Sequence, residues 1–200
     1  MKKIAVCGIV LCFTMMLCSI SFASPFIEQN KLNSNAMYAM KNKGPVNFSY
    51  HTPDGQFKVK LSYPHIKGKM IHAEAWMNDS KVYDYNLPAV DNGYMTRIYK
   101  DMASNRIFIS FSSYKSSILV GYNGNSKKVE TYVDSHNYYS GFAWAAPWLY
   151  SRNNGDLVLC FLDGYDDVPA HHKHIYVLDW DESAQWFNYR DEGISAYNRD

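Results

Sequence analysis

Leu157-Val158-Leu159-Cys160-Phe161, which follows the turn residues Asn154-Gly155, decides the fold because the chain contains this pattern three times. The other two copies, after Asp54-Gly55 and Ser104-Asn105, are Phe57-Lys58-Val59-Lys60-Leu61 and Ile107-Phe108-Ile109-Ser110-Phe111. The runs start at residues 57, 107 and 157, so the step is 50 residues both times. A turn and an apolar strand that recur at a fixed interval are typical of folds built from copies of one supersecondary unit.

Each copy predicts four strands, of which the quoted run is the second. The first strands are expected at 46–50, 96–100 and 147–151, the third at 70–77, 117–123 and 174–180, and the fourth at 81–86, 128–133 and 185–190. Polar turns rich in Asn, Asp, Gly and Ser join the third strand to the fourth. Helical periodicity is limited to a short turn at 36–41. The sequence therefore predicts an all-β chain of three antiparallel four-stranded repeats, blade-like as in a partial β-propeller, with a β-sandwich or a barrel as the alternative.

A second set of markers divides the chain. A glycine followed by a hydrophobic residue comes after each fourth strand, at Gly93, Gly141 and Gly193, so 193–200 is predicted to be the first strand of an unfinished fourth unit. The expected organisation is a signal peptide at 1–23, an N-terminal arm at 24–43 and a single repeat domain at 44–200. Closed propellers have about 4–8 blades, and three units leave open edges. We therefore expect a homodimer.

The third unit resembles a known type of blade. Ile175-Tyr176-Val177-Leu178-Asp179, a polar turn and then Gln185-Trp186-Phe187 are similar to the tryptophan-docking blades of PQQ-type propellers. The Thr-Gly pair of that family's turn is missing from every unit of this chain. The resemblance covers residues 175–187 and implies a blade-like unit, without implying the cofactor.

The first residues have the form of an export signal. Lys2 and Lys3 precede an apolar run at 4–20, and Ser21-Phe22-Ala23 matches the small-x-small cleavage pattern, so we expect the mature chain to start at Ser24 without a membrane span. Cleavage leaves 18 basic and 19 acidic side chains, a formal net charge of −1. A nearly neutral chain without basic runs is not expected to bind nucleic acid. We therefore expect a secreted or periplasmic protein.

One polar loop is a candidate metal site. Residues 163–174 carry carboxylates that suit calcium and histidines that suit zinc, and the candidate ligands are Asp163, Asp166, Asp167, His171 and His172. Their spacing matches neither a calcium loop nor His-Glu-x-x-His. The sequence therefore predicts no cofactor, and calcium or zinc is the ion that this loop would hold.

No motif of a catalytic centre is present in the sequence. The chain has no Gly-x-Ser-x-Gly elbow and no phosphate-binding glycine loop. Cys160, the one cysteine left after cleavage, lies within an apolar run and is expected to be a buried core residue. The sequence therefore leaves catalysis undecided and favours a protein that is not an enzyme.

Aromatic residues give the strongest indication of function. The stretch 138–148 holds five aromatic residues among eleven, in a region expected to connect two units. Rings beside polar side chains suit stacking on sugars or contact with a peptide, and the candidate ligand-binding residues are Tyr138, Tyr139, Trp144 and Tyr165. We therefore expect a non-catalytic binding protein for an envelope glycan or protein. The alternatives are a metal-assisted extracellular hydrolase and a structural protein that self-assembles in the envelope.

Overall fold

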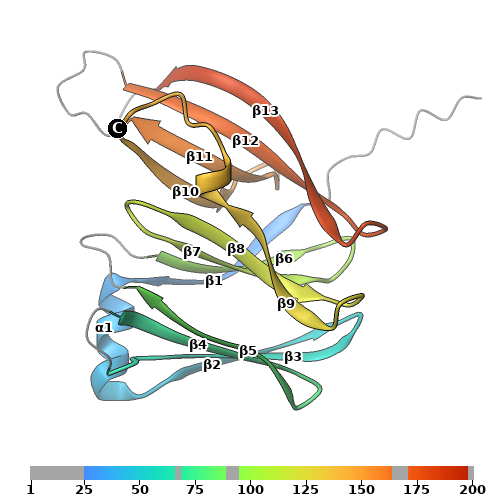
Figure 1. Ribbon diagram of the computed structural model, residues 1–200. Coiled ribbons are helices and arrows are strands. Elements are labelled where there is room, and N and C mark those ends of the chain that lie inside the picture. Colours follow the sequence, from blue (N-terminus) through green and yellow to red (C-terminus); the bar gives the residue numbers. More distant parts are fainter. Residues whose placement is uncertain (1–24, 66–68, 89–94, 164–170, 198–200) are drawn as a thin grey trace, which may run out of the picture.

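The computed structural model describes residues 25–65, 69–88, 95–163 and 171–197. Three antiparallel sheets lie one above another as tiers (Figure 1). The strand orders are β2-β3-β4-β5 in the first sheet, β1-β6-β7-β8-β9 in the middle sheet and β10-β11-β12-β13 in the third. The prediction of an all-β chain is confirmed, and the described strands do not close into a barrel or a ring.

The strand positions agree with the 50-residue period. The second strands of the units are β3 (Gly55–Ser62), β7 (Ile107–Ser112) and β11 (Leu157–Asp163). The remaining strands of the units are β2 (Val46–Thr52), β4 (Lys69–Met77), β5 (Ser80–Pro88), β6 (Met95–Asp101), β8 (Ser117–Asn123), β9 (Lys128–Asp134), β10 (Ala145–Ser151), β12 (His171–Asp181) and β13 (Trp186–Tyr197).

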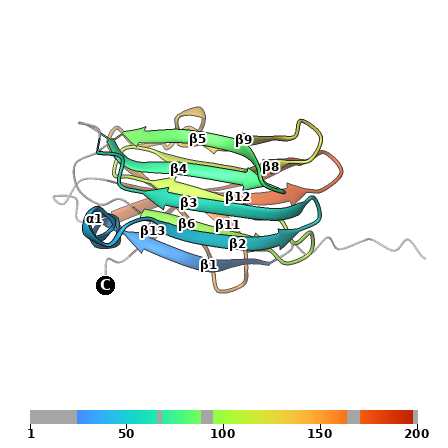
Figure 2. The same ribbon diagram turned by 90° about the horizontal axis from the view of Figure 1, so that it is seen from below.

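The N-terminal arm is folded onto the middle sheet. Residues Phe26–Asn33 form β1, which pairs with β6 and gives this sheet its fifth strand. Ser34–Lys43 form the helix α1, with Asn33 as its N-cap and the left-handed Gly44 at its end; the helix lies at one end of the strands (Figure 2). This pairing covers the open edge of β6, and it explains why the segment folds with the second unit and not with the first.

The interpretation of 193–200 as the first strand of a fourth unit is wrong for the described residues 193–197, which belong to the third sheet. Gly193–Tyr197 continue β13 and pair with β12, from Gly193 opposite Ile175 to Tyr197 opposite His171. The register shifts between Ile175 and Tyr176, so that an extra residue bends the strand there. The glycine that had indicated a new strand therefore lies just past a bulge, within the fourth strand of the third unit.

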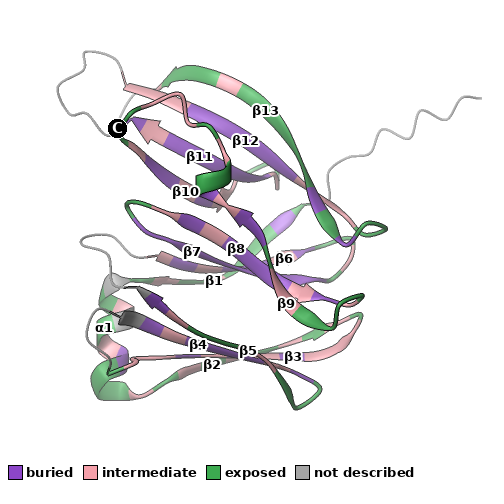
Figure 3. Cartoon of the chain, in the orientation of Figure 1, coloured by how far each residue is buried: buried purple, intermediate pink, exposed green. Residues whose placement is uncertain are grey.

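Two apolar layers hold the tiers together, as the buried strands in Figure 3 show. Successive side chains of a strand point to opposite faces, so the neighbours Ile109 and Phe108 of β7 enter different layers. The layer between the first and middle sheets includes Phe57, Val59, Leu61, Ile71, Ile109 and Phe111. The layer between the middle and third sheets includes Phe26, Phe108, Tyr132, Leu159, Tyr176 and Phe187.

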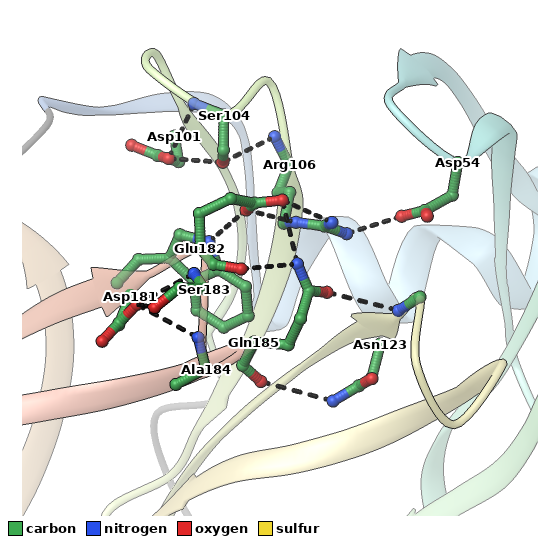
Figure 4. Close-up of polar contacts among 12 residues, drawn as sticks. Asp54, Asp101, Ser104, Arg106, Asn123, Asp181, Glu182, Ser183, Ala184 and Gln185 are labelled. Atoms are coloured by element: carbon green, nitrogen blue, oxygen red, sulfur yellow. Dashed lines mark hydrogen bonds and ion pairs between the residues drawn. The ribbon is translucent and has the colours of Figure 1, made fainter.

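A buried arginine joins one turn from each sheet at the other end of the strands (Figure 4). The Arg106 guanidinium, after β6, donates to Asp54 in the β2–β3 turn at 2.5 Å and twice to Glu182 in the β12–β13 turn, each at 2.7 Å. Its Cζ lies 5.8 Å from the centroid of the Trp180 ring. The cavity beside Asp54 and Arg106 has a volume of about 10 Å³, the space of one water. This cluster therefore fixes the tiers relative to one another and leaves no room for a larger ligand.

Candidate functional site

The connection between β9 and β10 carries the candidate ligand-binding residues and starts at a fixed point. Its first turn is the 3-10 helix η1 (Ser135–Asn137), which Asp134 caps by accepting a hydrogen bond from the His136 N–H at 3.0 Å. Ser135 is buried, and its hydroxyl accepts from the Ser117 N–H at 3.0 Å. Local Asp and Ser caps of this kind terminate the strand and direct the chain out of the sheet.

Two side chains of β12 hold the middle of this connection. The Tyr176 hydroxyl donates to the carbonyl oxygen of Tyr139 at 2.7 Å, and the His174 Nδ1–H donates to the carbonyl of Ser140 at 3.0 Å. His174 is positioned by the carboxylate of Asp191, 2.7 Å from its Nε2. The Gly193 N–H and the His174 ring hold the pKa of Asp191 below its usual range. Backbone oxygens that accept bonds from a sheet in this way give the connection one conformation.

Gly141 allows the connection to approach β13 closely. Its φ is +76°, and a Cβ at this position would lie 2.7 Å from Cδ1 of Ile194. Left-handed backbone and close approach both favour glycine. The flanking Ser140 hydroxyl donates to the Phe142 carbonyl at 2.9 Å, so the tight bend is also held from within.

The rings of the connection divide into packed and exposed ones. The Tyr138 ring packs against Tyr176 and Tyr189, with centroids 5.1 and 5.4 Å apart. Tyr139 is 79% exposed and Trp144 is 69% exposed. We call Tyr138, Tyr139, Trp144 and Tyr189 the aromatic platform. It includes three of the four predicted ligand-binding residues, whereas Tyr165 lies outside the described residues.

The described part of the predicted metal loop forms a hydrogen-bonded group around Asp163. Asp163 is buried, accepts from the His172 N–H at 2.7 Å and lies 3.3 Å from Nδ1 of His171. Burial opposes ionisation of Asp163, but the hydrogen bonds from His172 and His171 outweigh it and lower the pKa of this carboxyl. The geometry thus ties the end of β11 to the start of β12. Asp166 and Asp167 lie outside the described residues, so the predicted ligand set stays a prediction.

A different group of metal-ligand side chains lies on the first sheet. His72, Glu74 and Asp84 bring ligand atoms within 4.8 Å of one another, and they are the one such set of three in the described ranges. The Lys81 ammonium lies 2.5 Å from Glu74 and 2.6 Å from Asp84. A lysine cation thus already lies between the two carboxylates that a metal ion would need.

Cys160 is a buried, free cysteine, as the sequence predicted. Burial raises the pKa of its thiol to about 11. A reactive cysteine needs an accessible thiolate, so this side chain packs the third sheet and is not a nucleophile.

The sequence analysis missed the outward surface of the first sheet, including Trp76. The sequence does contain a pattern that indicates this surface, because polar residues alternate with apolar ones along β3. Trp76 lies on the polar face, on the neighbouring strand. Such alternation is also typical of any strand with one solvated face. The strand pairing was needed to show which polar residues surround the tryptophan.

The comparisons with known proteins add no relative. The chain matches no protein-family model, no curated protein and no solved structure. Within the described ranges, no helix combines the length and the apolar character needed to cross a membrane. The functional assignment therefore rests on the geometry of the aromatic platform.

Proposed function

We propose that this protein is an exported, non-catalytic binding protein that holds a glycan of the cell envelope on its aromatic platform. The observation that carries the proposal is the exposure of Tyr139 and Trp144 on a connection with a fixed backbone. Tyrosine and tryptophan offer large contact areas with few rotatable bonds, so they lose little entropy on binding.

Preorganisation supports a binding role for this connection. The carbonyls of Tyr139 and Ser140 already accept hydrogen bonds from β12. A ligand that stacks on these rings would not have to order the loop, and the cost of association falls accordingly. The Tyr138 ring also contacts the ring of Tyr189, which is exposed on β13.

The polar neighbours of the platform favour a glycan over a peptide. A sugar ring has a C–H face that stacks on aromatic rings and hydroxyls that both donate and accept hydrogen bonds. His136 and Asn137 are exposed on the same connection and offer partners of this kind. The export signal at 1–23 supports a secreted or periplasmic location, where such glycans occur.

Two other functions have less support, a metal-assisted hydrolase and a self-assembling envelope component. A metal-assisted hydrolase would use Asp163, His171 and His172, which are engaged with one another. A self-assembling envelope component would associate without ligand. The likeness of 175–187 to tryptophan-docking blades supports the view of the three sheets as consecutive blades of an open propeller.

Isothermal titration calorimetry with a purified neutral envelope polysaccharide tests the proposal. Tyr139→Ala and Trp144→Ala are each expected to weaken binding about tenfold or more, because truncation of a tyrosine or tryptophan that anchors an interface costs about 2 kcal/mol or more. The thermal midpoint should stay near that of the unmodified protein, since both rings are largely exposed. The matched control is Tyr38→Ala, a tyrosine that is 60% exposed on α1, and it should bind normally.

Two results would contradict the proposal. One is polysaccharide binding that survives both platform substitutions, which would place the glycan elsewhere. The other is the absence of any polysaccharide binding together with capture of an envelope protein that needs Tyr139 and Trp144, which would make the ligand a protein.

A further inference from the structure

Among the described side chains, the outward surface of the first sheet is polar except at one position. The strand register places the side chains of β2 to β5 alternately toward the middle sheet and outward, on the side that Figure 2 shows from below. We call the outward side the outer face, and its described members are Asn47, Ser49, His51, Gln56, Lys58, Lys60, Ser62, His72, Glu74, Trp76, Lys81, Asp84 and Asn86. Trp76 is half-buried there, and an indole with part of its surface accessible on an otherwise polar sheet suits contact with a ligand.

A groove of about 260 Å³ runs beside this tryptophan. Asn47 and Ser49 of β2, Lys58 and Lys60 of β3 and Trp76 of β4 line it. Its volume is slightly below the range of about 300–1,000 Å³ that is typical of small-molecule pockets. The groove therefore has room for one small ring, with the rest of a longer ligand extending over the sheet.

The groove is lined by two lysines and no acidic residue. Lys60 pairs with the buried Glu74 at 2.8 Å. Lys58 pairs with Asp79 at 2.6 Å, but the Asp79 side chain is 82% exposed. Exposed ion pairs contribute about 0–1 kcal/mol, so Lys58 can exchange this partner for an anionic group of a ligand.

A rigid network supports the groove from behind. Glu74 is 9% exposed and accepts hydrogen bonds from Lys60 at 2.8 Å and from Lys81 at 2.5 Å. These two lysines lower the pKa of the Glu74 carboxyl to about 2. The Lys81 Nζ also lies 5.7 Å from the centroid of the Trp76 ring. The buried carboxylate thus fixes both the lysine that lines the groove and the one that holds the indole.

We infer that the outer face is a second binding site, which takes a hexuronic acid unit of an acidic polysaccharide in the groove beside Trp76. The indole stacks on the C–H face of the sugar ring, and Lys58 pairs with its carboxylate. Asn47 and Ser49 bind hydroxyl groups, because an amide and a hydroxyl can each donate and accept. This site lies on the first sheet and the aromatic platform on the third, so each can be tested with the other intact.

The test uses the full mature chain, with calorimetry against a tetramer of hexuronic acid, a neutral hexose tetramer and inorganic phosphate. The uronate tetramer is expected to bind about tenfold more tightly than the neutral one, the effect of one hydrogen bond to a charged group. Trp76→Ala should weaken uronate binding about tenfold or more, and Trp76→Phe should retain most of it. Lys58→Met should lower uronate affinity to the neutral level, whereas the matched control Lys128→Met on β9 should bind as the unmodified protein does.

Equal binding of both tetramers, or uronate binding unaffected by Lys58→Met, would overturn the inference. Competition by millimolar phosphate as effective as that of the tetramer would show a simple anion site, which also contradicts it. Tyr139→Ala and Trp144→Ala should leave uronate binding unchanged, so failure of the platform and failure of this site give different results.

Discussion

Glu74 is a buried carboxylate on a surface that is otherwise open to water, and two lysines account for its presence there. Its pKa of about 2 reflects the hydrogen bonds from Lys60 and Lys81. An unfolded chain lacks both partners, so the carboxyl there titrates near 4.3. A folded pKa below the unfolded one means that ionised Glu74 stabilises the fold above about pH 4.3, and that this contribution disappears as the pH falls toward 2.

Urea denaturation at several pH values tests this coupling. Glu74→Gln removes the charge and keeps the volume, so it should destabilise the protein at pH 6. The difference in unfolding free energy between the two proteins should shrink steadily between pH 4.5 and pH 2, because Glu74 takes up a proton as the pH approaches its folded pKa of about 2. A free-energy difference that stays constant across this pH range would mean that the hydrogen bonds from Lys60 and Lys81 do not lower the pKa of Glu74.

Ile109 and Leu159 test the two apolar layers separately. Ile109 is 2% exposed between the first and middle sheets, and Leu159 is fully buried between the middle and third sheets. Substitution of either by alanine should cost about 2–5 kcal/mol through lost burial and the cavity left behind. Chemical denaturation measures the loss, and an unchanged midpoint for either variant would refute the corresponding layer.

At the scale of elements, the Arg106 cluster is the polar joint of the fold. Arg106→Ala leaves Asp54 and Glu182 facing each other without their cation, and the expected loss is about 1.5–3 kcal/mol. Arg106→Lys should recover only part of it, because a lysine cannot make the paired bonds to Glu182. Equilibrium unfolding followed by tryptophan fluorescence measures both variants. Full recovery by lysine would show that only the charge matters.

The extension of β13 gives a second prediction at this scale. A chain that ends at Gly193 lacks the partners of His171–His174 and the contact between Ile194 and Gly141. The amides of 171–174 should then exchange hydrogen faster, because they lose their place in a paired strand. Hydrogen-exchange mass spectrometry measures this rate. Unchanged protection of these amides would show that 193–200 does not pair with β12.

Local patterns predicted most strands, whereas long-range pairing decided the rest. The runs that became β3, β7 and β11 combine a turn with apolar residues, which a short stretch of sequence encodes fully. β1 gave no such signal, because most of its side chains are exposed and its partner β6 is about 70 residues distant. Gly193 was misinterpreted because a glycine followed by a hydrophobic residue marks a bulge as well as a turn.

The two candidate sites also differ in how far the sequence alone predicts them. The aromatic platform was recognisable from composition, since Tyr138, Tyr139 and Trp144 lie within seven residues. The groove at Trp76 depends on three strands that are adjacent only after pairing, and no short stretch contains its lining. Sites gathered across a sheet therefore need the register before they can be identified.

At the scale of the whole molecule, the homodimer expected from the open repeat count stays a prediction. The third sheet carries a separate apolar cluster, in which Val158, Cys160 and Val177 are buried and Tyr150 and Leu162 are partly buried. Symmetric pairing of two copies through this cluster would be the commonest form of association. Light scattering at micromolar concentration should give twice the chain mass, and Leu162→Lys should give the monomer. A monomeric unmodified protein would contradict the prediction.

Hydrogen-exchange footprinting with acidic envelope polysaccharide tests the central claim, that the rigid tiers carry ligand-binding surfaces, most directly. The exchange of backbone amides is compared with and without polysaccharide. We expect slower exchange in two places, at 136–145 around the aromatic platform and in the peptides of β2 to β4 that surround Trp76. Exchange that is unchanged at both places, or slowed only within 171–174 beside Asp163, would contradict the account.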